Sequence, residues 1–254
     1  MLNIQKLTFF YFTVIWVCYL LGYMTWLIFG ICLAVYFGVM LYGIFYIGSG
    51  FYIKVTCRAK TVKNQIAISF DDGPDKIITP KILDLLKASG IKATFFIIGS
   101  KAVSETEIIQ RILDEGHLIG NHSFAHNNWY GFWSTKKITD DLKMTHSLME
   151  THFDKKLLYF RPPFGVTNPL IKKAVAKMKY TTIGWSLRSL DTMIKSENRL
   201  LKRLKRKLKP GQIVLFHDNL PQTLNILQDF ISYTIENHYN ILPLDELTGE
   251  KVYE

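Results

Sequence analysis

The first part of the chain is almost continuously hydrophobic. From Leu7 to Ile53 the sequence contains no charged residue. A helix needs about 20 apolar residues to cross a bilayer, so this stretch is long enough for about two spans. We expect a break between Gly22 and Gly30, and a tight hairpin of two transmembrane helices is favoured over one span followed by an interfacial segment. The apolar run far exceeds the core of a cleaved signal peptide, so the chain is expected to stay in the membrane.

The rest of the chain alternates short apolar runs with segments of helical periodicity. Strands are predicted at residues 66–70, 93–98, 118–119, 157–160, 181–185, 213–216 and 241–242. Helices are predicted at residues 80–89, 105–115, 136–152, 168–179, 198–208 and 224–237. This alternation is typical of an α/β protein with a parallel sheet or barrel. We therefore predict an anchor with a basic flank, residues 1–60, and one domain, residues 61–254.

Charged and titratable residues follow the ends of the predicted strands. They are Asp71, Asp72, His122, His126, Arg161, Asp191 and His217. In a parallel β/α barrel the carboxyl ends of the strands meet on one face, where active sites lie. We therefore expect these residues to share one pocket although they are far apart in the sequence.

Three of these residues are compatible with a metal site. His122 and His126 are four residues apart, which on a helical turn places both imidazoles on one face, and Asp72 offers a carboxylate. Two histidines and one carboxylate suit either zinc hydrolysis or ferrous iron and oxygen. The adjacent Asp71 favours hydrolysis, because a hydrolytic site uses a base beside a metal-bound water and an oxygenase does not.

The remaining candidates supply charge and protons. Arg161 could keep Asp71 ionised and oriented, and the Pro-Pro turn that follows it could direct a backbone N–H at a developing oxyanion. His217 ends an apolar run and could donate a proton to a leaving amine, with Asp191 as the partner that keeps it protonated. Taken singly, each of these residues also has an ordinary structural explanation, so the hypothesis depends on their combination.

Charge and cysteine content add little to the function. The net charge of +10 lies almost wholly outside the apolar stretch and is densest at Lys202–Lys209, where interleaved leucines predict a helix with a solvated basic face. Attraction of this face to anionic lipid is the alternative, and no nucleic acid is expected as a partner. Basic residues after the apolar stretch favour a cytoplasmic second flank, but the side of the domain stays open. Cys18, Cys32 and Cys57 form no metal or redox spacing.

The candidate residues resemble, in order and type, the motifs of the polysaccharide deacetylase family, also called the NodB homology domain or carbohydrate esterase family 4. The stretches that carry the resemblance are Ser69–Pro74, His122–His126, Arg161–Gly165, Trp185–Asp191 and Leu215–His217. The resemblance spans about residues 64–247. It implies a distorted (β/α) barrel of the NodB type, and metal-dependent removal of acetyl groups from N-acetylated sugars.

The resemblance also implies roles for individual residues. Asp71 would be the general base, oriented by Arg161, and His217 would be the general acid, supported by Asp191. The ligands of one divalent ion, expected to be zinc with cobalt or nickel as alternatives, would be Asp72, His122 and His126. Residues in contact with the substrate would be Phe164, through its backbone N–H, Leu215, against the acetyl methyl group, and Trp185.

Three positions depart from the family pattern. Phe164 stands where the family usually has tyrosine, Arg188 where an acid is common, and Thr192 where tryptophan is common. The first departure removes a hydroxyl but leaves the backbone N–H. The other two affect the assignment of Asp191 and of the substrate wall more than that of the metal site.

The sequence therefore predicts a membrane-anchored N-deacetylase that acts on an N-acetylhexosamine polymer such as peptidoglycan, or on a lipid-linked sugar. Two alternatives stay open. One is a deformylase or O-acetyl esterase acting on a lipid-linked or envelope sugar, because the motifs do not specify the acyl group. The other is an inactive glycan-binding module, which is disfavoured because a binder needs neither a base nor an acid.

Overall fold

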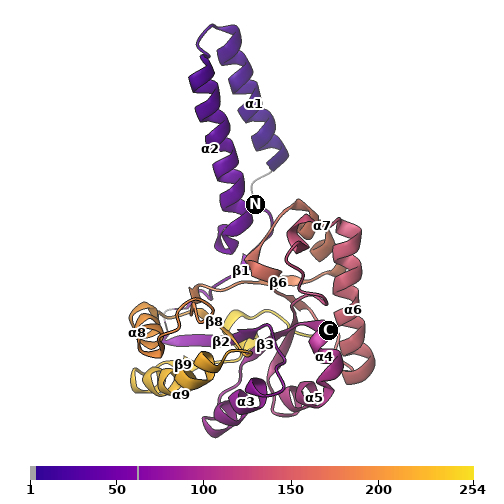
Figure 1. Ribbon diagram of the computed structural model, residues 1–254, viewed down its shortest axis with the longest axis vertical. Helices are drawn as coiled ribbons and strands as arrows, with labels where there is room; N and C mark the ends of the chain where they lie inside the picture. The colour runs from indigo at the N-terminus through magenta and orange to yellow at the C-terminus, as the bar shows by residue number, and fades with distance from the viewer. Residues whose placement is uncertain (1–3, 62) are drawn as a thin grey trace.

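The computed structural model describes residues 4–61 and 63–254. A pair of antiparallel helices extends from one end of a domain that is built around a parallel sheet (Figure 1). Residues 1–3, in the predicted anchor, and residue 62, in the predicted domain, lie outside the described residues.

A hairpin of two helices is present where two transmembrane helices were predicted. It consists of α1 (Ile4–Leu20) and α2 (Trp26–Phe45), whose side chains are mostly exposed. The break lies at residues 21–25, beside Gly22, and not as far along as Gly30, which is inside α2. Within the described residues α2 is the one helix long and apolar enough to cross a membrane, whereas the apolar part of α1, Thr8–Leu20, is shorter than the roughly 20 residues that a span needs.

The sheet confirms the predicted α/β class. Its strands are β1 (Val55–Thr56), β2 (Gln65–Asp71), β3 (Thr94–Ile97), β4 (Leu118–Asn121), β5 (Tyr159–Phe160), β6 (Thr181–Ile183), β7 (Leu187–Arg188), β8 (Ile213–His217) and β9 (Asn240–Ile241). They are paired in the order β1-β6-β5-β4-β3-β2-β8-β7, with β9 also on β2. These pairs are parallel, and the sheet curls into a half-barrel of the predicted NodB type.

Helices cover the outer face of the sheet (Figure 1). They are α3 (Ile78–Ala88), α4 (Gly99–Ser104), α5 (Thr106–Asp114), α6 (Thr135–Phe153), α7 (Pro169–Met178), α8 (Glu197–Lys207) and α9 (Pro221–Glu236). The short α10 (Leu244–Thr248) packs instead against Ala67 on the other face. Short 3-10 turns are η1 (Ile47–Ser49), η2 (Tyr130–Phe132) and η3 (Pro163–Gly165). Helices α4 and α10 were not predicted because they are too short to show a helical repeat, and neither were the two-residue strands β1 and β7.

The central strand β2 separates an apolar layer from the interior of the half-barrel. Ile66, Ile68 and Phe70 pack with buried side chains of α3 and α9, and Ala67 belongs to a second cluster completed by α10. Residues of a strand alternate between its two faces, so Asp71 lies on the same face as Ala67. That inner face changes from apolar to polar as β2 approaches its carboxyl end.

The hairpin is joined to the domain by direct contacts. At the end of α2 the carbonyls of Gly43 and Ile44 accept hydrogen bonds from the hydroxyl and the backbone N–H of Thr167, at 2.9 and 3.0 Å. The buried Tyr52 donates to the sulfur of Met40 on α2, at 3.3 Å. The chain then enters β1, which pairs with β6. The division of the chain at residue 60 stays a prediction, and the segment just before it already contacts the domain.

One buried histidine away from the strand ends makes stability depend on pH. The Nδ1 atom of His117 accepts a hydrogen bond from the backbone N–H of Ala93, at 3.1 Å, so the folded chain holds the imidazole neutral. Burial, together with the charge of Lys92, lowers the pKa of His117 from 6.5 to about 4. Between these values the unfolded chain binds a proton that the folded chain excludes, so the free energy of unfolding falls as the pH falls.

We expect His117→Asn to reduce this loss. Between pH 7 and pH 4.5 the parent should lose about 2 kcal/mol more of its free energy of unfolding than the variant does. Urea unfolding of the full chain in detergent, followed by circular dichroism at both pH values, measures the difference. His152→Asn, at an exposed position, is the control and should follow the parent. Equal acid losses in parent and His117→Asn would contradict the assignment.

Candidate active site

The register of the sheet brings the strand ends together at one edge. Asp71, the last residue of β2, is paired with His217, the last residue of β8. Asn121 ends β4 beside Phe160 of β5, so His122 and Arg161 follow at neighbouring positions. Parallel strands end on the same side, which is why the residues predicted from strand ends converge.

Asp72 is turned away from the strand by its backbone. Its φ of 71° lies in the left-handed region, and Lys101 donates a hydrogen bond to its carbonyl at 2.7 Å. The following residue has to be glycine, because a Cβ on Gly73 would lie 2.1 Å from a carboxylate oxygen of Asp218. The turn leaves the side chain of Asp72 partly exposed while Asp71 stays buried.

The two histidines converge through a loop, and the expectation that a helical turn aligns them is wrong. The chain after β4 has positive φ values at Ser123 (68°) and His126 (43°), and no helix forms there. The carboxylate of Asp141 on α6 accepts the backbone N–H groups of Phe124 and Ala125, at 2.8 and 3.0 Å. The loop therefore takes its shape from a side chain that lies far along the sequence.

The resulting donor set fits a divalent cation. The Nε2 atoms of His122 and His126 lie 3.4 and 3.2 Å from one carboxylate oxygen of Asp72, and one potential ligand atom from each residue lies within 4.8 Å of the others. Nδ1 of His122 is 2.8 Å from the carbonyl of Arg161, which only accepts, so Nδ1 carries the hydrogen. In the neutral ring the lone pair is then on Nε2, which faces Asp72, as a metal ligand requires.

The electrostatics of this set also suit a cation. Burial alone would raise the pKa of Asp72, but the hydrogen bond and charge of a protonated His122 outweigh it and hold this pKa well below its ordinary value. Burial would lower the pKa of His122, but Asp71 and Asp72 raise it, so an ion that binds here would displace a proton from His122. Burial and the charge of His122 lower the pKa of His126 to about 4, so its imidazole is neutral at pH 7. An ionised carboxylate beside a neutral imidazole is the protonation state that metal binding needs.

Asp71 and Arg161 form a buried ion pair behind this set. Their side chains are 2.6 Å apart, and both residues are buried. The guanidinium also donates to the hydroxyl of Ser69 at 2.9 Å and to the carbonyl of Gly184 at 2.8 Å, and it stacks on Phe96 at 3.9 Å. Arg161 therefore pairs with Asp71 and fixes its orientation.

His217 and Asp191 form a second buried pair. Nδ1 of His217 lies 2.7 Å from Oδ1 of Asp191, whose other oxygen accepts from the hydroxyl of Thr223 at 2.8 Å. Burial would lower the pKa of His217, but the hydrogen bond and charge of Asp191 raise it above its ordinary value. Nε2 of His217 is left facing the site, 4.0 Å from Asp72.

A pocket of about 270 Å³ joins these groups. Its lining residues are Asp71, Asp72, His122, His126, Phe164, Gly165, Trp185, Arg188, Thr192, Leu215 and His217. Arg161 and Asp191 do not line the pocket. They are hydrogen-bonded to two residues that do, Asp71 and His217. The structure thus brings together every residue that the sequence nominated, together with the two departures Arg188 and Thr192.

Comparison with known proteins agrees with this geometry. The sequence profile described as "Polysaccharide deacetylase" matches residues 58–183. A peptidoglycan-N-acetylglucosamine deacetylase of Bacillus cereus is 32% identical over 202 residues, which cover 78% of this chain and 94% of that protein. The chain belongs to the polysaccharide deacetylase family.

Other members extend the comparison. The peptidoglycan-N-acetylglucosamine deacetylase PgdA of Listeria monocytogenes is 31% identical over 210 residues, or 82% of this chain, but the match covers only 43% of that longer protein. The crystal structure of the Bc1960 peptidoglycan N-acetylglucosamine deacetylase superposes with a TM-score of 0.73 at 26% identity, covering 79% of this chain and 95% of the other. The family fold is therefore shown along most of the chain.

Some buried residues that shape this site were not predicted from the sequence. Asn121 accepts the backbone N–H of Ser123 at 2.8 Å and holds the start of the histidine loop. Asp218 is buried, accepts from Thr79 at 2.7 Å, and burial raises its pKa to about 7. Asn121 and Asp218 are each adjacent to a recognised motif in the sequence, and this adjacency could have indicated that they lie at the site. Asp141 and Thr223 carry no such signal, because only the folded chain brings them to the site.

Proposed function

We propose that this chain is a metal-dependent hydrolase that removes N-acetyl groups from N-acetylhexosamine-containing glycans, either peptidoglycan-like or lipid-linked. The observation that carries the proposal is the placement of two buried pairs, Asp71 with Arg161 and His217 with Asp191, around one cation-binding set in a single pocket. A base and an acid that are held separately suit the hydrolysis of an amide, which needs both.

Asp72, His122 and His126 would hold the divalent ion, with zinc as the first candidate and cobalt or nickel as alternatives. Such an ion supplies Lewis-acid chemistry, polarising the acetyl carbonyl and lowering the pKa of a water molecule. Asp71 would accept the proton of that water as a new C–O bond forms to the acetyl carbon. Because Arg161 holds one carboxylate oxygen, the other stays available for the proton.

His217 would complete the reaction as the general acid. Its imidazolium, stabilised by Asp191, would give a proton to the sugar nitrogen as the C–N bond breaks, leaving acetate and a free amine. The backbone N–H of Phe164 would donate to the oxyanion that develops on the acetyl oxygen. Leu215 would contact the acetyl methyl group and Trp185 the sugar, since both line the pocket.

The hairpin is proposed to hold the enzyme at a membrane. An integral anchor is supported by α2, which is long enough to span a bilayer, and by its shorter apolar partner α1. The proposal does not specify which side of the membrane the domain faces. Resemblance to peptidoglycan deacetylases makes a cell-envelope glycan the first substrate class to test.

Removal of the metal tests the reaction. We expect a chelator to lower acetate release from N-acetylglucosamine oligomers by about 100-fold or more for the full chain in detergent, and zinc to restore it. His122→Ala should lose both metal content and activity, whereas His152→Ala, at an exposed position, should lose neither. An unchanged rate of acetate release in the presence of the chelator would contradict the proposal.

Substrate choice separates the remaining alternatives. Release of formate, or of acetate from an O-acetylated sugar alone, would identify a deformylase or an esterase. Bound metal and bound glycan without release of any acyl group would identify a binding module.

A further inference from the structure

Two large aromatic side chains are exposed together near the candidate site. Trp129 is 67% exposed and Phe132 is 81% exposed, and their rings lie 5.7 Å apart. Both belong to the loop at residues 127–134, which connects the second motif to α6 and contains η2. Exposed aromatic clusters mark interaction surfaces, and tryptophan in particular is favoured at the boundary between a bilayer and water.

The loop at residues 127–134 is attached to the end of the hairpin. Asn168 donates a hydrogen bond to the carbonyl of Gly131, between the two aromatic residues, at 2.6 Å. The preceding residue, Thr167, is the one bonded to Gly43 and Ile44 at the end of α2. Figure 1 shows α7, which starts at Pro169, at the hairpin end of the domain, and α9 at the opposite end. The loop that carries the aromatic pair is therefore attached beside the point where a membrane-spanning α2 would leave the bilayer.

The same segment forms part of the pocket. Phe164 lines the pocket, is 54% exposed, and its ring lies 4.8 Å from the ring of His126. Only three residues separate it from Asn168 and two from Thr167. The mouth of the pocket, the loop at residues 127–134 and the end of α2 are thus connected through one short stretch of chain.

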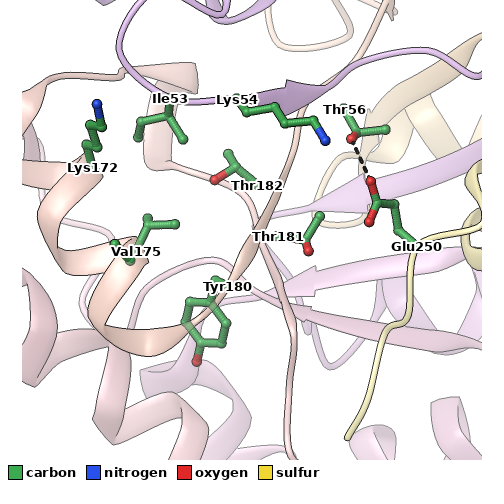
Figure 2. Close-up of a pocket in the computed structure, with 10 residues that line it drawn as sticks. Ile53, Lys54, Thr56, Lys172, Val175, Tyr180, Thr181, Thr182 and Glu250 are labelled. Carbon is green, nitrogen blue, oxygen red and sulfur yellow. Dashed lines mark hydrogen bonds between the residues drawn. The ribbon is translucent and has the colours of Figure 1, made fainter. Parts of the chain in front are cut away.

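Cations lie on another part of the hairpin end. A second cavity of about 270 Å³, between β1 and α7, is bordered by Lys54 and Lys172 (Figure 2). Lys54 follows the hairpin closely, and Glu250, 3.5 Å from the hydroxyl of Thr56, is the acid that lines this cavity. Lysines at this level would face lipid phosphates, as basic residues beside membrane spans do.

Resting on the proposed function, we propose that the loop at residues 127–134 is a second membrane contact, with Trp129 and Phe132 in the bilayer interface. This contact holds the mouth of the pocket at the lipid surface. The substrate class that follows is an N-acetylated sugar carried on a lipid, because its sugar lies at the level of the headgroups. The bilayer is the occupant chosen because the loop that carries the aromatic pair is bonded to the segment that holds the end of the apolar hairpin.

Fluorescence quenching tests the membrane contact without using activity. The full chain carrying Phe132→Cys, with Cys18, Cys32 and Cys57 replaced by alanine, is labelled with an environment-sensitive dye and placed in vesicles that contain a nitroxide lipid. We expect about a twofold or larger loss of fluorescence at position 132. The control is Ile235→Cys on α9, which is 56% exposed at the opposite end of the domain and should not be quenched. Equal quenching at both positions, or none at position 132, would overturn the proposal.

Activity on two substrates tests the substrate class. The double variant Trp129→Ser with Phe132→Ser should lose about tenfold in acetate release from an N-acetylated sugar on a polyprenyl phosphate in vesicles, and less than twofold on a soluble oligomer. The control, Val103→Ser with Ile235→Ser, removes two other exposed apolar side chains and should match the parent on both. Equal losses on both substrates would mean that the aromatic pair contacts sugar, and no loss on the lipid-carried sugar would also overturn the proposal. If the parent acts on neither substrate, the proposed function fails, and the quenching result still decides the membrane contact.

Discussion

Asp71→Asn is expected to slow acetate release by about 10³-fold, which is the scale for losing a positioned general base. The amide has nearly the same size as the carboxylate but cannot accept the proton of the attacking water. Asp71 is not part of the Asp72, His122 and His126 set, so zinc content should stay near that of the parent. Initial rates on N-acetylglucosamine oligomers and metal analysis of the same preparation measure the two effects.

The variant needs a structural control because it leaves Arg161 without its buried counter-charge. Asp218→Asn makes the same chemical change at a second buried carboxyl beside the site, which the mechanism does not use. Its rate should stay within a few-fold of the parent. Asp71→Asn that folds, binds zinc and keeps more than about a tenth of the parent rate would remove Asp71 from the role of base.

The largest effect on stability is expected from Arg161→Ala. This change leaves the buried Asp71 without its ion-pair partner. It also removes hydrogen bonds to Ser69 and Gly184 and the contact with Phe96. Loss of one partner from a buried pair costs about 3–5 kcal/mol, a large share of the roughly 5–15 kcal/mol by which domains are stable. Urea unfolding of the full chain in detergent should therefore show a sharply lower midpoint, or no folded protein.

Two comparisons make the result for Arg161 specific. Arg111→Ala removes another arginine that pairs with two acids, Asp84 and Glu115, but this one is partly exposed and should cost about 1 kcal/mol or less. Arg161→Lys keeps the charge without the planar set of donors and should fall between the two alanine variants. Similar costs for Arg161→Ala and Arg111→Ala would contradict the view that Arg161 is a buried structural centre of the site.

Sequence patterns predicted what depends on neighbouring residues. The apolar run that becomes β2 ends at two acids, and the rule that parallel strands end on one face was enough to bring Asp71 beside His217. The hairpin followed from length and the absence of charge. The predicted position of its break was too broad. Gly22 ends α1 with a positive φ, whereas Gly30 lies inside α2, and the sequence does not distinguish these two glycines.

What the sequence could not give depends on distant contacts. The spacing of His122 and His126 suggested a helical turn, and the actual loop owes its shape to Asp141 on α6, which no local pattern connects to it. Asp191 was nominated in spite of its altered surroundings, and its firm placement depends on Thr223 of α9. Strands β1 and β7 are two residues long, so they form because the sheet is already present.

The pairing of β1 with β6 has a practical consequence for work on this protein. β1 is the outermost strand on its side of the sheet, and its residues Val55 and Thr56 cover β6 at Thr182 and Ile183. A water-soluble fragment cut at residue 60 would lack this strand and would present unpaired backbone groups at an open edge. Such an edge favours self-association. Aggregation of the fragment would therefore reflect the position of the cut and not a defect of the domain. A fragment that starts before β1 avoids this artefact.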